Sequence, residues 1–172
     1  MARFTNRGNI EIRFFSALET YPTFDPEEVA TTQTIRFGIL QNQAENIQHG
    51  SGSEGECIAD MGGWELSQSE IAVPDICSNV TGNIPGEITT GSAYLEYYDD
   101  DVSTPSRDLL QTGLRGWVTI VPQGIEVGNK GDWWPVRVQA NRNLLNIGNE
   151  AARFRIDFTT SQPVEFEIIP NA

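Results

Sequence analysis

The stretch Ser103–Gly124, STPSRDLLQTGLRGWVTIVPQG, predicts a short helix that leads directly into a buried strand. Thr104 is a favourable N-cap residue, and the fixed backbone of Pro105 suits the first helical position. Asp108 lies in the first turn, where the helix dipole favours a negative charge. Since a helix over Pro105–Thr112 is too short to be stable alone, we expect it to pack on a sheet.

Three leucines form the apolar side of this helix: Leu109, Leu110 and Leu114. Gly113 and Gly116 are available to end the helix, because glycine readily adopts the backbone conformation that follows a last helical turn. The residues that follow, Trp117–Val121, are apolar and β-branched and are typical of a buried strand. Pro122 ends that strand, so the helix and the strand are joined with almost no loop.

Most of the remaining chain has the alternation of apolar and polar residues that predicts strands. The expected strands cover residues 9–15, 34–40, 63–69, 87–98, 133–140, 151–159 and 164–169, with an extended segment at 70–73. Residues 19–33 and 75–86 are rich in Pro, Gly and polar residues and predict loops and turns. A chain of 172 residues fits one domain over 1–172, and the fold class is mainly β, a β-sandwich or small barrel with one short flanking helix.

Residues 41–56, QNQAENIQHGSGSEGE, contain almost no large apolar residues and predict a long mobile loop. Loops of this length inside a compact domain are usually either functional or disordered. Strand-like segments of the same domain lie on both sides of it, which favours a function over a plain linker.

Charge is distributed unevenly along the chain, whose formal net charge is −13. Residues 37–106 contain no Lys or Arg and hold 12 acidic residues, whereas the rest of the chain has 12 acidic and 11 basic residues. Ten of the 11 basic residues are arginines. A field this negative argues against binding nucleic-acid phosphates by charge, although a solubilising surface would have the same composition.

Residues for catalysis, metal binding and cofactor binding are scarce. A single histidine, His49, and two cysteines, Cys57 and Cys77, leave a structural zinc site without ligands and argue against histidine-based catalysis. We therefore expect no enzyme activity, no metal and no cofactor. The run Asp99–Asp101 could hold a cation or form a solvated turn, and Asn79-Val-Thr81 matches a glycosylation sequon.

No apolar run has the length of a membrane span, and the N-terminal residues show no secretory signal. We therefore expect a protein that is made in a cytoplasm and does not bind membranes.

The order of these elements resembles that of the major tail tube proteins of long-tailed bacteriophages. Four segments carry the resemblance: GWELSQSEIAVPDICSNV (63–80), DLLQTGLRG (108–116), GWVTIVPQG (116–124) and DWWPVRVQANRN (132–143). The resemblance is clearest from about Gly63 to the C-terminus, and the order of elements also fits before Gly63, where Ile35–Leu40 leads into the long loop. It rests on family-style patterns, without a catalytic signature.

This resemblance implies a β-sandwich with a flanking helix, six copies of which form a ring that joins a continuous β-barrel around a channel. The rings stack into the tail tube of the virion after synthesis in the host cytoplasm. The tape measure, terminator and distal tail proteins are the implied partners, and genomic DNA passes through without specific binding.

The resemblance also implies roles for particular residues. The loop between two sheet strands would reach the next ring, and its expected contact residues are Gln41, Asn42, Glu45, Asn46, His49 and Glu54. An acidic lumen would let DNA slide without sticking, and the expected lumen-facing acids are Glu56, Glu65, Glu87 and Glu96.

Other functions fit the same sequence. A tail terminator would stop at one ring, and a capsid decoration protein would form only a small oligomer. A carbohydrate-binding module would use Trp133 and Trp134 as a flat platform for sugar rings.

Overall fold

The computed structural model describes residues 10–16, 34–42, 44–48, 58–74, 81–98, 105–144, 148 and 152–170. Its elements are, in chain order, β1 (Glu11–Ser16), β2 (Thr34–Arg36), α2 (Phe37–Asn42), β3 (Glu45–Gln48), β4 (Ile58–Gly62), β5 (Leu66–Pro74), β6 (Thr81–Thr90), β7 (Ala93–Tyr98), α3 (Pro105–Leu109), β8 (Arg115–Val121), β9 (Lys130–Leu144), β10 (Arg153–Thr160) and β11 (Val164–Ile169). The expected mainly β fold class is confirmed.

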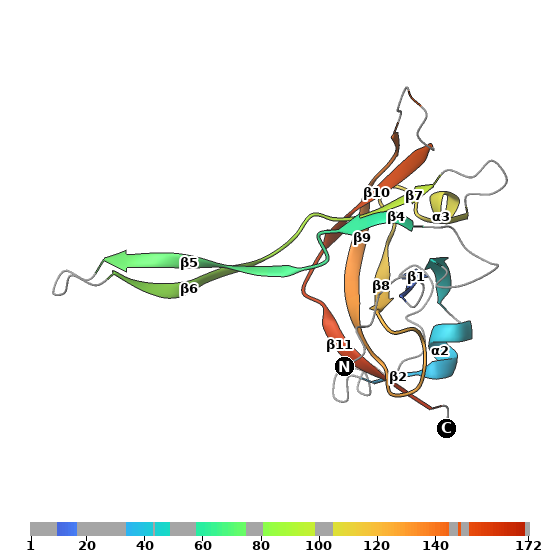
Figure 1. Cartoon of the computed structure of the whole chain (residues 1–172), viewed down its shortest axis with the longest axis horizontal. Helices are drawn as coiled ribbons and strands as arrows, with labels where there is room; N and C mark the ends of the chain where they lie inside the picture. The colour runs from blue at the N-terminus through green and yellow to red at the C-terminus, as the bar shows by residue number, and fades with distance from the viewer. Residues whose placement is uncertain are drawn as a thin grey trace.

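Nine of these strands form one curled sheet, and the other two, β5 and β6, form a ribbon of their own (Figure 1). The order across the sheet is β3-β1-β8-β9-β10-β7-β4, and β11 pairs with β9 and with β2. The first half of β9 pairs with β11 and its second half pairs with β10, while β8 lies along its other edge. β9 is therefore the strand around which the body is arranged.

The sheet buries apolar side chains on both of its faces. Successive residues of a strand point to opposite faces, and three apolar doublets on neighbouring strands are buried at both positions: Phe14-Phe15, Ile120-Val121 and Trp133-Trp134. In each doublet one residue joins one core cluster and its neighbour joins the other. We call the sides that carry these clusters the first and second faces of the sheet, with Trp134 on the first face and Trp133 on the second.

Helix α3 packs on the first core cluster, with Leu110 fully buried immediately after it. Leu109 and Leu114 are partly buried against the same cluster. The side-chain amide of Asn141 on β9 donates hydrogen bonds to the carbonyls of Arg107 (3.0 Å) and Leu110 (3.1 Å). Carbonyls at a helix end have no partner within the helix, so Asn141 both caps α3 and fixes it to the sheet.

The two glycines after the helix have different roles. Gly113 has a φ of 93° and donates its N–H to the carbonyl of Val138, so it makes the turn expected at the helix end. Gly116 instead lies within β8, opposite Ser16 and Val136. The expectation that Gly116 ends the helix is wrong.

The expected strand at 34–40 is wrong beyond Arg36, because residues 37–42 form the helix α2. Phe37 and Leu40 are three residues apart and both pack on the second core cluster, so burial of one helical face decides the local structure. The expected single strand at 87–98 is also interrupted, since β6 ends at Thr90 and β7 begins at Ala93.

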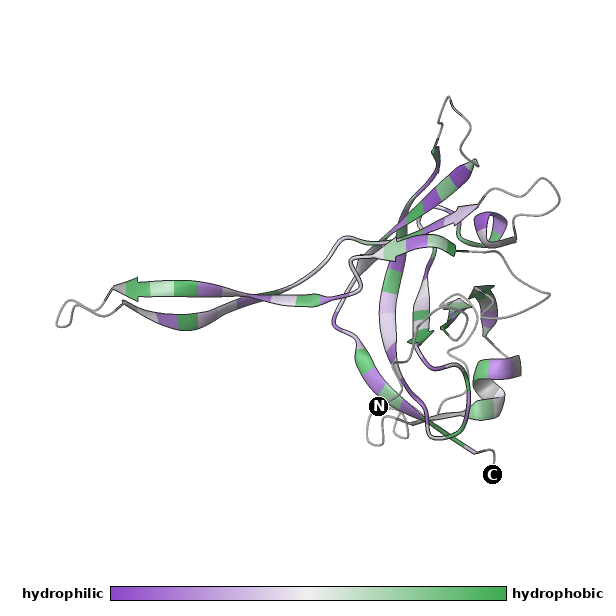
Figure 2. Cartoon of the chain, in the orientation of Figure 1, coloured by the Kyte–Doolittle hydropathy of each residue, from purple (hydrophilic) through white to green (hydrophobic). Residues whose placement is uncertain are grey.

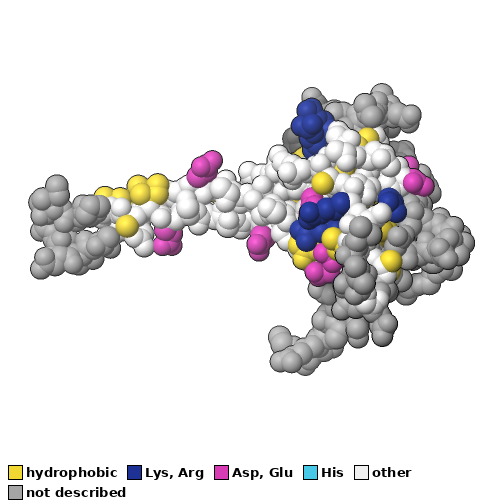
Figure 3. All heavy atoms as spheres, turned by 90° about the horizontal axis from the view of Figure 1, so that it is seen from above, with side chains coloured by type: hydrophobic (Ala, Val, Ile, Leu, Met, Phe, Trp, Pro, Cys, Tyr) yellow, Lys and Arg dark blue, Asp and Glu magenta, His cyan; other side chains and the backbone are white. Residues whose placement is uncertain are grey.

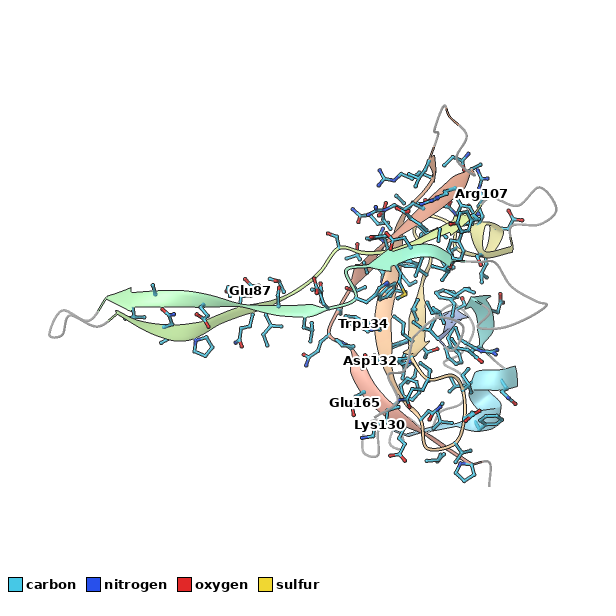
Figure 4. All side chains as sticks on the ribbon, in the orientation of Figure 1. Glu87, Arg107, Lys130, Asp132, Trp134 and Glu165 are labelled. Carbon is cyan, nitrogen blue, oxygen red and sulfur yellow. The ribbon has the colours of Figure 1, made fainter. Side chains whose placement is uncertain are left out.

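The pairing of β9 with β11 places two carboxylates side by side. Asp132 lies directly opposite Glu165, and the ammonium of Lys130 is 3.5 Å from the Glu165 carboxylate (Figure 4). Partial burial, and then the charge of Glu165, raise the pKa of Asp132 above its ordinary value. Directly opposed like charges destabilise an antiparallel pair.

Replacing Leu110 by Ala should lower the free energy of unfolding by about 2–5 kcal/mol, because it removes a fully buried side chain between helix and sheet. The matched variant Leu109→Ala removes a partly buried leucine and should cost less. Urea unfolding of both variants measures the difference. Equal losses for the two would show that α3 is not anchored through Leu110.

Replacing Asp132 by Asn should raise the stability at pH 7 relative to the unchanged chain. The folded chain holds a proton on Asp132 more tightly than the unfolded chain, whose ordinary value is 3.8, so ionisation above that pH disfavours folding. The gain should therefore vanish in acid, below the unfolded value. Urea midpoints measured from pH 3 to 7 test this, and a loss of stability at pH 7 would contradict it.

Candidate functional site

The ribbon of β5 and β6, which we call the arm, projects away from the body of the molecule (Figure 1). Gly63 lies at its junction with the body, with a φ of 74°, and a Cβ atom there would clash with the carbonyl oxygen of Ser92. The junction is held by hydrogen bonds from the Gly91 N–H to the Glu65 carbonyl and from the Thr90 hydroxyl to the Thr160 carbonyl, both 3.1 Å long. The arm therefore leaves the body in a defined direction.

Most of the exposed large hydrophobic residues in the described part of the chain lie on the arm. In the described part of the chain, seven large hydrophobic residues are exposed, and five of them lie on the arm: Leu66, Ile71, Val73, Ile84 and Ile88. Each is 41–55% exposed, and Figure 2 shows hydrophobic residues recurring along both strands. Contiguous exposed apolar residues on a soluble chain usually mark an interaction surface.

The register of the arm places these residues on opposite faces. Near the tip, Ile71 lies directly opposite Ile84 and shares its face with Val73. Near the base, Leu66 and Ile88 lie on the other face. Side chains alternate between the two faces of a strand, and the step from Leu66 to Ile71 along β5 is an odd number of positions. The apolar side of the arm therefore changes between its inner and outer halves.

A β-bulge separates these two halves. The register runs from Gln68↔Ile88 to Glu70↔Pro85, so β6 has one extra residue there. The Gln68 side chain donates a hydrogen bond to the Gly86 carbonyl, at 3.2 Å. Bulges bend a ribbon and increase its twist, which further separates the directions of the two apolar patches.

The arm and its base carry only negative charges: Glu65, Glu70 and Glu87. Glu70 accepts a hydrogen bond from the Asn83 side chain (3.0 Å), whereas Glu87 stands exposed near the middle of the arm (Figure 4). On the face shown in Figure 3, the arm carries acidic side chains and no basic ones among the described residues, whereas the body carries both.

A network of charged and aromatic residues covers the second face of β4, β7, β10 and β9. Arg155 stacks on the Tyr94 ring, 3.8 Å from its centroid, and forms ion pairs with Asp157 (2.7 Å) and Glu96 (3.4 Å). The Tyr94 hydroxyl donates a hydrogen bond to Asp60 (2.9 Å), which is the main reason that the pKa of Tyr94 is raised. Oppositely charged groups within this network offset one another.

The residues expected to face a lumen lie in different places. Glu96 on β7 is bound by Arg153 and Arg155, so two arginines offset its charge. Glu65 is at the base of the arm and Glu87 is on the arm, while Glu56 lies outside the described residues. The three described acids do not form a single acidic row.

The expected contact loop at 41–56 is partly regular structure. Gln41 and Asn42 end α2, and Glu45 and Asn46 belong to β3, which pairs with β1 at the edge of the sheet. His49 and Glu54 lie outside the described residues, as do Cys57, Cys77, Asn79 and Asp99–Asp101. The role of this segment between rings stays a prediction.

The arm itself was not anticipated as a unit. The sequence predicts extended structure at 63–73 but turns at 75–86, because Pro85 and Gly86 are unusual within strands. The signal that was available is Ile84, an apolar residue within this segment that lies directly opposite Ile71 of β5.

The hypothesis of a sugar-binding platform on Trp133 and Trp134 is wrong, because each residue is only 3% exposed. Trp134 packs edge-on against Trp64, with ring centroids 5.8 Å apart, and Trp133 packs against Trp117 at 4.6 Å. Both tryptophans therefore belong to the core.

In the described part of the chain, no three His, Cys, Asp or Glu side chains are grouped so that they could hold a metal ion. The helices found there are all too short or too polar to cross a membrane.

Comparison with known structures places the fold among phage tail components. A chain of the anti-feeding prophage baseplate, from a structure symmetrised sixfold, aligns with a TM-score of 0.57 and 11% identity over 97% of this chain and 98% of that chain. The tail tube protein of SPP1 aligns with a TM-score of 0.53 and 10% identity over 94% of this chain and 78% of that chain. No curated protein sequence matches this one.

The family model described as "Phage tail tube protein" matches residues 53–172, which include the arm, α3 and the strands from β4 onwards. The chain therefore belongs to the phage tail tube protein family and is a structural component of a phage tail.

Proposed function

We propose that six copies of this chain close into a ring, that the rings stack into a tube, and that the tube conducts the phage genome. Family membership and the sixfold symmetry of the baseplate structure to which the fold is similar support this proposal. The tape measure, terminator and distal tail proteins would be its neighbours in the tail, and assembly would take place in the host cytoplasm. The role is mechanical and requires no catalytic group.

The exposed apolar surface of the arm is the observation that best supports self-assembly. A two-stranded ribbon is marginally stable in water when nothing covers it, and this one exposes five large apolar side chains. Burying one such side chain contributes about 1.5–3 kcal/mol. Contact with neighbouring copies would therefore stabilise both the arm and the assembly.

The two apolar faces of the arm suit a position between two surfaces. Its inner half presents Leu66 and Ile88 on one face, and its outer half presents Ile71, Val73 and Ile84 on the other. A ribbon that lay on one flat surface would leave one of these patches in water. We infer that each arm contacts more than one neighbouring subunit.

A second candidate function is a tail terminator, which would form one ring and stop. The same exposed arm could seal a single ring, so the two functions differ in whether rings stack. The segment 41–56 and its residues remain our proposed contact between rings, together with the arm.

Electron microscopy of the purified chain over a series of concentrations and salt concentrations should show hollow tubes of stacked rings. Higher salt should favour assembly, because it screens the repulsion between copies of net charge −13. Isolated rings would identify a terminator instead. Monomers under every condition would contradict self-assembly.

The double variant Ile71→Ser and Ile84→Ser should raise the concentration required for assembly by at least about tenfold, because two exposed apolar side chains can no longer be buried between copies. The free energy of unfolding of the monomer should change little. Ser67→Ala and Thr89→Ala remove a hydrogen-bonded pair on the inner half of the arm and provide the matched control. Light scattering measures assembly, and urea unfolding measures stability. Unchanged assembly of the Ile variant would contradict a contact at the outer half of the arm.

A further inference from the structure

Two arginines face each other on the second face of the sheet, and no described carboxylate offsets their charge. Arg115 on β8 lies directly opposite Arg137 on β9, and both are exposed. Within the described residues, no carboxylate forms an ion pair or hydrogen bond with either of them. Side chains directly opposite each other in an antiparallel pair are about 5 Å apart at Cβ, and like charges at this distance destabilise the pair.

The other arginines on this face have partners, and this sets the pair apart. Arg142 pairs with Asp157 (3.3 Å), Arg153 with Glu96 (4.0 Å), and Arg155 with both acids. Among the described residues, the face therefore has a neutral network on one side and a pair of unpartnered positive charges on the other. An anion bound between Arg115 and Arg137 would form charge-assisted hydrogen bonds with both guanidinium groups.

An apolar cross-strand pair lies beside the arginine pair. The next pair on the same face along β8 and β9 is Trp117 with Pro135, and both residues are only half-buried. A complementary protein ligand would therefore offer a carboxylate and tolerate apolar surface beside it. Nucleic-acid phosphates would complement the positive charge of the two arginines but not the neighbouring apolar pair.

The arm offers such a carboxylate at Glu87, which is exposed and has no partner among the described residues. The other two carboxylates suit the role less well, since Glu70 is bonded to Asn83 and Glu65 lies at the base of the arm, where its backbone carbonyl is bonded to Gly91. The arm points away from the body, so it cannot reach the arginines of its own chain (Figure 1).

We propose that Arg115 and Arg137 receive the arm of a second copy of this chain, with Glu87 bound between the two guanidinium groups. This inference rests on the proposed self-assembly and names the surfaces that meet. The contact joins unlike surfaces, so each copy gives one arm and accepts another. Such a contact can close a ring or continue along a tube.

A charge exchange tests the pairing. Arg137→Glu and Glu87→Arg should each raise the concentration required for assembly by about tenfold or more, because each brings like charges together. A single chain that carries both changes should assemble at close to the original concentration. Arg142→Glu makes the same change of charge on the same strand and face, and it should assemble normally. Far-UV circular dichroism verifies that each variant is folded.

Cross-linking gives a measurement that does not depend on blocking assembly. The chain has one lysine, Lys130, which lies 3.5 Å from Glu165 and provides an internal positive control for carbodiimide coupling. In assembled Arg137→Lys, mass spectrometry of mixed light and heavy chains should find position 137 joined to Glu87 of another chain.

Three results would overturn the inference while leaving the proposed function intact. They are normal assembly of Arg137→Glu, no recovery in the doubly exchanged chain, and coupling of position 137 to another carboxylate or to none while the Lys130–Glu165 product forms. If assembled wild-type chain bound duplex DNA and Arg137→Glu did not, the pair would be assigned to phosphate instead. Failure of the unchanged chain to form rings or tubes would count against the proposed function itself.

Discussion

The hydrogen-bond ladder of β9 is the constraint on which the rest of the body depends. This 15-residue strand pairs with β8 over residues 132–137 along one edge, and with β11 and then β10 along the other. Backbone groups of a buried strand must all find partners, so the path of β9 fixes the positions of three other strands. Asn141, on the same strand, fixes α3 through its side chain. Trp133 and Trp134 extend from it into the two cores.

The chain separates its charges in space as well as in sequence. The arm is acidic and partly apolar, while arginines gather on the second face of the sheet, where all but two are held by carboxylates or rings in the described part of the chain. Such a network stiffens the sheet but attracts neighbouring copies only weakly, since its charges already have partners within the chain. Exposed apolar side chains and charges without a partner in the monomer are the groups that contact with a neighbouring copy can stabilise.

Much of the body could be predicted from sequence, because its signals are local. The alternation of apolar and polar residues predicted most strands of the sheet, and the capping residues near Pro105 predicted α3. The helix at Phe37–Asn42 could not be predicted, because its short apolar run fits a strand equally well until a second core cluster is present to bury one helical face. The arm was missed for a similar reason: Pro85 and Gly86 are tolerated there only because both edges of the ribbon are free.

The thickness of the arm has a mechanical consequence. The body is a sheet with packed apolar clusters on both faces, whereas the arm is a single layer of two strands with an irregular register at its middle. A two-stranded ribbon without a core resists bending much less than a sheet with packed side chains on both faces does. If arms link the subunits of a tail, curvature would be taken up by elastic deformation of the arms, while the bodies kept their shape. The bore of the tube could then stay constant in diameter as the tail flexes.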